Sequence, residues 1–201
     1  MKDATAPPVQ PVDRPRMFSH VAYMTGDTEV TADFYCRILG MEFVNAVLDD
    51  KIPSTGEAIP YFHSFFRLGD GSTIAFFEAP DLPPAQDPPH PAYKTFQHVA
   101  MQVPTVADVD RWHAWLEASG VDVLGPVDHK ITYGIYFFDP NGIRLEINTP
   151  LDPTWNDNAA AANVSLAEWK RAKELARANG EDLAVVLGNL TRERSHLRAT
   201  R

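Results

Sequence analysis

The sequence predicts an α+β fold that contains two repeated β-α-β-β-β modules and a C-terminal helical extension. Three observations lead to this prediction. A proline-rich linker at 80–91 separates residues 17–79 from residues 92–150, two segments of similar size. Both segments begin with the letters His-Val-Ala, at His20 and at His98. Beyond the second segment the pattern changes to that of amphipathic helices.

The order of elements is the same in the two modules. After the first strand, apolar side chains recur at helical spacing until a glycine, Gly40 or Gly120, ends the helix. These side chains are Val30, Phe34, Tyr35 and Ile38 in the first module, and Val106, Val109, Trp112 and Leu116 in the second. Three β-rich segments follow each helix: 41–49, 62–68 and 73–78, then 121–129, 131–138 and 143–148.

Composition limits the classes of function. The chain has 201 residues, of which 44% are hydrophobic and 22% charged, as in ordinary globular proteins. Its net charge of −9 argues against binding to nucleic acid or to an anionic membrane, because both need a basic surface. It has no apolar run long enough to span a membrane and no secretory signal. A lone cysteine, Cys36, excludes an intrachain disulfide and fits the cytoplasm, so any metal must be held by histidine and carboxylate.

The two ends of the chain lie outside the repeat. Four prolines predict that residues 1–16 form a disordered tail. At 151–201 we expect two helices, the first starting at the capping box of Ser165 and Glu168 and ending at Gly180. Apolar side chains line one face of each: Leu166, Trp169 and Leu175, then Leu183, Val186, Leu187 and Leu190. Such faces need a cover, and we expect a homodimer rather than packing on the same chain.

Strand alternation indicates which face of its strand each of two candidate ligands, His98 and Glu146, occupies, and the repeat adds His20. In the segment 97–103 the apolar side chains share one face, which leaves His98 on the other. In 143–148 the same argument puts Glu146 opposite the isoleucine and leucine side chains, together with Arg144 and Asn148. A single strand histidine is more often a hydrogen-bonded structural residue than a ligand. Because His20 and His98 occupy equivalent positions of a repeat, pseudo-twofold symmetry favours the ligand interpretation.

Two imidazoles and one carboxylate are a known metal-binding set. With open coordination positions they form the facial triad that non-haem Fe(II) prefers, and Mn(II) or Zn(II) can also use it. The candidate metal ligands are therefore His20, His98 and Glu146.

On these residues the chain resembles the vicinal oxygen chelate superfamily, the fold of glyoxalases, bleomycin-resistance proteins and extradiol dioxygenases. The resemblance covers residues 17–150. It implies that the paired modules form a cupped, half-open β-barrel around one metal. The family's first-strand histidines correspond to His20 and His98, and its last-strand glutamate corresponds to Glu146 in the segment DPNGIRLE.

Within that superfamily the second module is most similar to type I extradiol ring-cleaving dioxygenases. Their C-terminal motif has a histidine, an aliphatic-tyrosine pair, a proline, a glycine and a glutamate, found here as His129, Ile135-Tyr136, Pro140, Gly142 and Glu146. The resemblance implies an Fe(II)-dependent enzyme that cleaves a small aromatic diol with O₂, with His129 and Tyr136 catalytic. Without a catalytic role, these two are a turn residue and a strand aromatic. Four strand side chains are candidates to wall the substrate pocket: Phe65, Phe66, Phe76 and Phe77.

Two positions depart from parts of the family. Ala75 stands where glyoxalase-I-like members have a fourth ligand, which favours the three-ligand branch. Ser72 stands near the place of a further active-site histidine of larger extradiol enzymes, so the usual proton handling is in doubt. Two alternatives therefore stay open. One is a metal-dependent isomerase, epimerase or lyase of the glyoxalase type; the other is a metal-free module that binds a small ligand, which has no need of the two-histidine, one-glutamate set.

Overall fold

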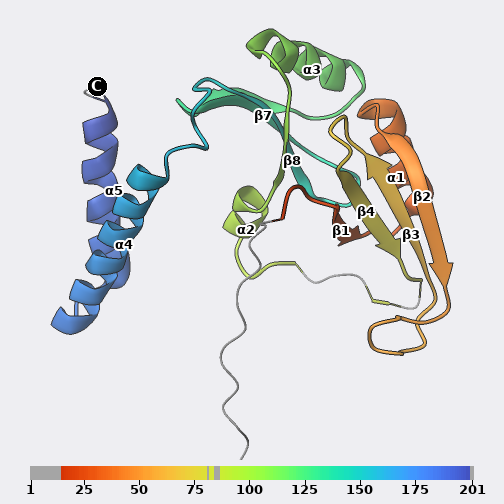
Figure 1. Cartoon of the computed structure of the whole chain (residues 1–201), viewed down its shortest axis with the longest axis horizontal. Helices are drawn as coiled ribbons and strands as arrows, with labels where there is room; N and C mark the ends of the chain where they lie inside the picture. Colours follow the sequence, from red (N-terminus) through yellow and green to blue (C-terminus); the bar gives the residue numbers. More distant parts are fainter. Residues whose placement is uncertain (1–14, 81, 84–86, 200–201) are drawn as a thin grey trace, which may run out of the picture. The chain divides into compact units, whose positions relative to one another are not determined.

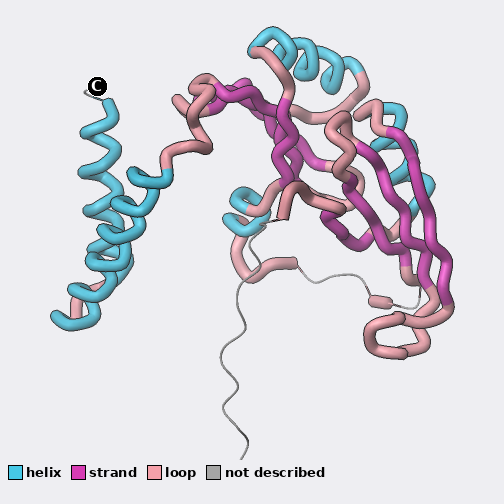
Figure 2. Tube along the Cα trace, viewed as in Figure 1, coloured by secondary structure: helices cyan, strands magenta, loops and turns pink. Residues whose placement is uncertain are grey.

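The computed structural model describes residues 15–80, 82–83 and 87–199 (Figure 1). Most of the tail expected at 1–16 therefore lies outside the described residues. The chain divides into two compact units, Met1–Thr149 and Pro150–Arg201. The first unit contains the sheets, and the second consists of helices and loops (Figure 2).

The first module forms a four-stranded mixed sheet and one helix that changes from α-helical to π-helical along its length. Its elements are β1 (His20–Met24), α1 (Thr28–Asp33), a π-helical segment η1 (Phe34–Ile38), β2 (Glu42–Asp49), β3 (Tyr61–Arg67) and β4 (Thr73–Glu78). The strand order is β1-β4-β3-β2, with β1 parallel to β4 and the other pairs antiparallel.

The second module repeats this topology. Its elements are β5 (Val99–Gln102), α3 (Val106–Ala118), β6 (Leu124–Asp128), β7 (Thr132–Phe138) and β8 (Arg144–Pro150), preceded by the short helix α2 (Ala92–Phe96). The order β5-β8-β7-β6 matches that of the first sheet, and β5 is again parallel to β8. The predicted α+β fold of paired modules is confirmed, and the two sheets do not close into a barrel within the described residues.

Local sequence explains where the helices begin and end. The Asp27 carboxylate accepts hydrogen bonds from the first amides of α1, and the Thr105 hydroxyl does the same for α3. Gly40 and Gly120 have φ values of +68° and +80°, a left-handed conformation that glycine adopts without strain. Both glycines therefore end their helices, as the sequence predicts.

One hydrophobic core serves both modules. It joins η1 to α3 and to inward-facing side chains of both sheets, and its members are Phe34, Tyr35, Ile38, Leu39, Phe66, Ile74, Phe76, Val109, Leu116, Ile135, Phe137, Leu145 and Ile147. In β8 the two core residues alternate with Arg144, Glu146 and Asn148, so these three side chains share the opposite face.

A buried polar network also joins the modules. The Tyr35 hydroxyl donates to Oδ2 of Asp139 at 3.1 Å, and the Thr25 hydroxyl donates to Oδ1 of Asn141 at 2.8 Å. Burial raises the pKa of the Asp139 carboxyl, which also accepts the backbone amides of Asn141 and Ile143. The turn before β8 is thus anchored to the helical segment of the first module.

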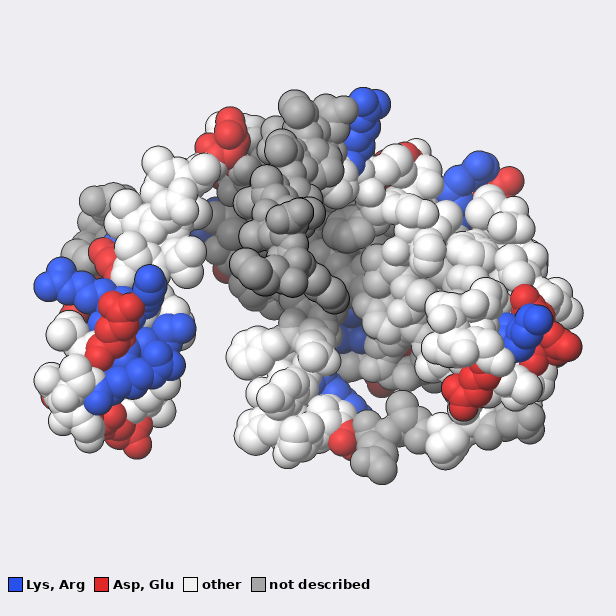
Figure 3. Space-filling model, turned by 60° about the horizontal axis from the view of Figure 1, so that its bottom comes forward, with Lys and Arg blue, Asp and Glu red and all other residues white. Residues whose placement is uncertain are grey.

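The second unit is a pair of helices, α4 (Ala159–Asn179) and α5 (Leu183–Ala199). The predicted start at Ser165 is wrong: α4 begins six residues earlier, because four consecutive alanines strongly favour helix. The predicted stop at Gly180 is confirmed by its φ of +67°. Lys, Arg, Asp and Glu side chains are interspersed on this unit (Figure 3). None of the described helices is long and apolar enough to cross a membrane.

Candidate active site

The geometry of the site centres on His98 and Glu146. His98 directly precedes β5 and Glu146 lies in β8, the strand that pairs with β5. The His98 Nε2 atom is 2.9 Å from Oε2 of Glu146. The carboxylate is buried, with its side chain 5% exposed, whereas the imidazole is 32% exposed. The pairing of β5 with β8 thus places a partly exposed imidazole next to a buried carboxylate.

The hydrogen bonds of His98 indicate that a cation belongs at this pair. Its Nδ1 atom lies 2.9 Å from the carbonyl oxygen of Phe96, an atom that only accepts, so Nδ1 carries the hydrogen. In a neutral ring, Nε2 then presents a lone pair to the Glu146 carboxylate. Two acceptors at this distance require a proton or a metal ion. A ring fixed through Nδ1 by a carbonyl is also the usual arrangement of a metal-binding histidine.

The Glu146 carboxylate lies in space that Gly134 leaves free. An added Cβ on Gly134 would lie 3.0 Å from Oε1 of Glu146 and 2.9 Å from Cβ of Asn148. The Asn148 amide donates to the same Oε1 at 2.8 Å. Glycine on β7 and asparagine on β8 therefore fix the orientation of the carboxylate.

Gly134→Ala is expected to displace the Glu146 carboxylate, because the new methyl group has no room between β7 and β8. We expect overpacking to cost about 1–3 kcal/mol of unfolding free energy and the affinity for a divalent metal to fall by ~10- to 100-fold. Thermal melts and metal titration measure the two effects. Gly26→Ala is the matched control, since its Cβ would meet nothing within 4 Å. Equal metal affinity in both variants would contradict the prediction.

Tyr136 and His129 lie on the same side as Glu146. The Tyr136 hydroxyl is 2.8 Å from Nε2 of His129, and the Tyr136 and His98 rings meet edge to face at 5.9 Å. Burial raises the pKa of the Tyr136 phenol, the nearby Glu146 carboxylate raises it further, and the Arg144 guanidinium opposes them. The phenol therefore keeps its proton at neutral pH and can donate it.

His20 lies apart from this group. Its Nδ1 is 3.3 Å from the Ser19 hydroxyl, and its ring packs against His63 and Phe65 at centroid distances of 5.9 and 5.6 Å. Among the residues that the structure describes, no three His, Cys, Asp or Glu side chains are grouped as a metal site. The structure thus brings together four of the five predicted site residues, His98, Glu146, Tyr136 and His129, and leaves His20 in the first module.

The equivalent places of the two modules have exchanged their large and small residues. Ala22 pairs with Ala75 as Ala100 pairs with Glu146, so Ala75 occupies the position of the carboxylate. His63 precedes Ala75 by the same spacing as Gly134 precedes Glu146, and its buried ring stacks on Phe77 at 3.6 Å. The first module thus has a histidine where the second has Gly134, and an alanine where the second has Glu146.

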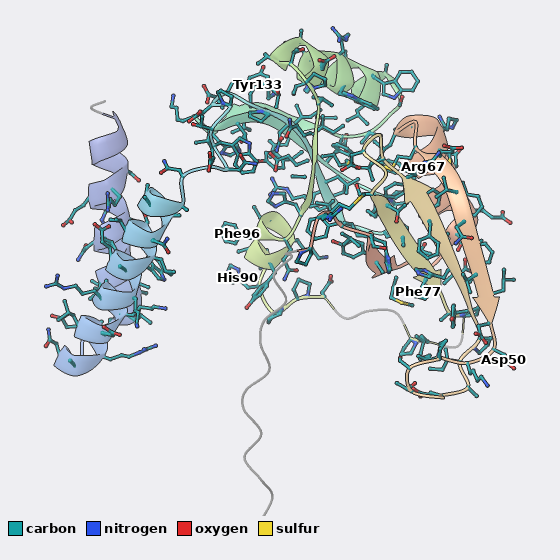
Figure 4. All side chains as sticks on the ribbon, viewed as in Figure 1. Asp50, Arg67, Phe77, His90, Phe96 and Tyr133 are labelled. Atoms are coloured by element: carbon teal, nitrogen blue, oxygen red, sulfur yellow. The ribbon has the colours of Figure 1, made fainter. Side chains whose placement is uncertain are left out.

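The remaining phenylalanine candidates divide between the two faces of the first sheet. Phe66 and Phe76 are fully buried core residues, whereas Phe65 and Phe77 contact His63 on the other face of the sheet, where Figure 4 marks Phe77. Ser72 lies in the turn before β4 and donates to Asp70 at 2.5 Å. It therefore serves the turn, as an Asp-Ser pair commonly does.

Sequence reasoning did not assign roles to four residues: His63, Gly134, Asn148 and Arg144. Arg144 and Asn148 could have been found, because they share the strand parity of Glu146. The part of Gly134 depends on contact between strands, which no pattern within one strand reveals.

Comparisons with known proteins identify the family of the chain. A family model described as the Glyoxalase/Bleomycin resistance protein/Dioxygenase superfamily matches residues 17–147. Two dioxygenases are similar: biphenyl-2,3-diol 1,2-dioxygenase 2 of Rhodococcus globerulus, 28% identical over 65% of this chain, and metapyrocatechase of Pseudomonas sp. strain CF600, 26% identical over 70%. The chain spans only 60% and 41% of the lengths of these two relatives.

Other relatives differ in chemistry. The metallothiol transferase FosB of Staphylococcus saprophyticus is 26% identical over 65% of this chain and 75% of its own length. Among solved structures, a glyoxalase/dioxygenase from Nostoc punctiforme is 25% identical and has a TM-score of 0.51, with 72% of this chain and 100% of that protein covered. The family includes dioxygenases and transferases alike, so membership alone does not select one reaction.

Proposed function

This chain belongs to the Glyoxalase/Bleomycin resistance protein/Dioxygenase superfamily, and we propose that within it the chain is an extradiol-type dioxygenase. Its substrate is a small aromatic diol, which it cleaves with O₂ in the cytoplasm. The observation that carries the proposal is the Tyr136 hydroxyl, bonded to His129 beside the Glu146 carboxylate. A metal-dependent lyase or transferase needs no such phenol and imidazole pair at its carboxylate ligand. Two similar relatives carry dioxygenase names, which supports the same choice.

The metal proposed for this site is Fe(II), with Mn(II) or Zn(II) as alternatives. The donor chemistry fits, because Nε2 of His98 and Oε2 of Glu146 already face one another at 2.9 Å. Nδ1 of His98 is bonded to the carbonyl oxygen of Phe96, and Oε1 of Glu146 accepts from the Asn148 amide. His20 is the proposed third ligand because it occupies the place of His98 in the repeat. Fe(II) in such a site lets electrons pass from a bound diol to O₂ without an organic cofactor.

The chain's own groups then position the diol and move its protons. The Tyr136 phenol holds a proton for a ring oxygen, because burial keeps it protonated. His129, which is exposed to solvent, exchanges that proton with water by way of its bond to the phenol. Gly134 leaves room for the Glu146 carboxylate, and the Asn148 amide holds its Oε1 atom at 2.8 Å.

One experiment tests the proposal and separates the alternatives. The protein is reconstituted anaerobically with Fe(II), a panel of catechols is added, and O₂ uptake and ring-opened product are measured. We expect equimolar uptake of O₂ with at least one catechol. Metal binding without O₂ uptake would favour a Lewis-acid isomerase or lyase, which the similarity to a metallothiol transferase also supports. Failure to bind metal would leave a ligand-binding module.

A homodimer is proposed for the helical unit. Val186, Leu187 and Leu190 of α5 are partly buried against α4, whose Ala176 is fully buried. On α4, however, Leu166 and Leu175 remain 63% and 50% exposed. Among the described side chains of this unit nothing covers these two leucines, and a second copy of the chain is the commonest cover.

Removing the helices is therefore expected to produce a monomer. Light scattering should give twice the chain mass for residues 1–201 and the single mass for a chain that ends at Pro153. Leu166→Glu should act in the same direction without a deletion. A monomeric full-length protein would contradict the proposal, as would a shortened chain that stays dimeric.

A further inference from the structure

Arg144 holds a position in the site that neither the motif nor the metal set uses. It is partly buried on β8, on the same face as Glu146 and Asn148. Its guanidinium carbon lies 4.1 Å from the centre of the Tyr136 ring. One terminal nitrogen, Nη1, donates to the carbonyl oxygen of Thr95 in α2. The charge is thus held directly beside the proposed catalytic phenol.

The guanidinium is not neutralised by a carboxylate in the described part of the chain. Four other arginines, Arg37, Arg67, Arg111 and Arg194, form ion pairs with acidic side chains. For Arg144 no such pair is found among the described residues, although Glu146 is close in sequence. The two oxygens of Glu146 face Asn148 and His98 instead. Several donors of a partly buried cation therefore stay available for a ligand.

The charge of the whole chain makes this cation distinctive. The chain carries a net charge of −9, which disfavours the approach of small anions. A guanidinium beside Tyr136, without a carboxylate partner among the described residues, supplies a local positive charge that such an anion needs. Guanidinium is planar and presents paired donors that match a carboxylate, which a lysine ammonium does not.

We propose that Arg144 binds a carboxylate of the substrate, so that the preferred substrate class is an aromatic diol bearing a carboxylate on its ring or on a short side chain. The inference rests on the proposed function for the diol part of the substrate. The carboxylate contacts the guanidinium while the diol oxygens lie toward Tyr136 and Glu146. Specificity then comes from one residue of β8, two positions before the proposed ligand.

Anaerobic binding tests the inference without turnover. Dissociation constants of catechol, 2,3-dihydroxybenzoate and 3,4-dihydroxybenzoate are measured by calorimetry on the full-length Fe(II)-loaded protein. We expect at least one of the two acids to bind about 10- to 100-fold more tightly than catechol, the usual gain from a charge-assisted pair. Arg144→Gln should remove that difference. Arg67→Gln, an exposed arginine of β3, is the control and should keep the difference.

The outcomes separate this inference from the proposed function. A preference for an acid that depends on Arg144, in a protein that takes up no O₂ with any diol, supports the carboxylate site and overturns only the dioxygenase proposal. Equal affinities of wild type for catechol and both acids overturn the carboxylate site, whatever the variants do. An unchanged preference in Arg144→Gln also overturns it. If Arg144→Gln does not fold, Arg144→Lys is measured instead. Lysine keeps the positive charge but lacks the planar pair of donors, so the preference for the acid should fall by about 3- to 10-fold. An unchanged preference overturns the inference.

Discussion

Glu146→Ala is expected to leave a folded protein that no longer retains a metal. Wild type reconstituted with Fe(II) should hold about one ion per chain, as a facial triad does, and the variant should fall to background. The physical reason is the position of the carboxylate: it is buried and supplies negative charge 2.9 Å from Nε2 of His98. Elemental analysis after gel filtration measures the content, and circular dichroism checks the fold. Activity with any catechol should disappear together with the metal.

A second histidine and glutamate pair provides the matched control. On α3, outside the candidate site, Nδ1 of His113 lies 3.4 Å from Oε2 of Glu117. Glu117→Ala should therefore keep full metal content. If Glu146→Ala retained as much iron as Glu117→Ala, the proposed metal centre would be wrong.

The third ligand is tested in the same way. His20→Ala should lose the metal, and His63→Ala, which removes the ring packed against His20, should keep it. Full retention in both variants would contradict His20 as a ligand. Retention in His20→Ala with loss in His63→Ala would also contradict it and would point to His63 instead.

Tyr136→Phe is expected to lower turnover by ~10²- to 10⁴-fold, the usual contribution of one acid-base group, while metal content stays unchanged. The phenol lies close enough to the Glu146 carboxylate for that charge to raise the phenol's pKa, and the substitution removes the phenol oxygen while keeping the ring. His129→Ala should have an effect in the same range, because it removes the partner of that oxygen. Steady-state rates and elemental analysis on the same samples separate chemistry from metal loss.

Another tyrosine of β7 is the control. Tyr133 donates to Asp110 on the other face of the sheet, at 3.0 Å, and Figure 4 marks it above β7. Tyr133→Phe should leave turnover within about twofold of wild type, as surface substitutions usually do. Equal activity of Tyr136→Phe and Tyr133→Phe would reduce Tyr136 to a structural role.

Much of the fold follows from patterns within single segments. Repeated His-Val-Ala starts, helical spacing and glycine stops each depend on neighbours in sequence, and the structure confirms the paired modules they predict. Alternation also assigns the faces of β5 and β8, because a strand must turn successive side chains to opposite sides. The start of α4 was missed because a capping box can lie inside a helix when alanines precede it.

Features that depend on contact between distant segments could not be predicted in this way. Symmetry suggested that His20 and His98 would meet, but the His20 ring packs against His63, a residue whose partner in the repeat is a glycine. The anchoring of Asp139 by Tyr35 likewise joins the two modules through space. Repeat symmetry describes the backbone of this protein better than it describes its side chains.

The exchange of large and small residues between the modules limits how the protein can evolve. Ala75→Glu alone would direct a carboxylate at the ring of His63, and His63→Gly alone would leave an empty space among Phe65 and Phe77. Each single change is costly, although the double change reproduces the pair found in the second module. A fourth ligand in the first module would therefore need two substitutions made together. The difference between the two modules is thus hard to remove one substitution at a time.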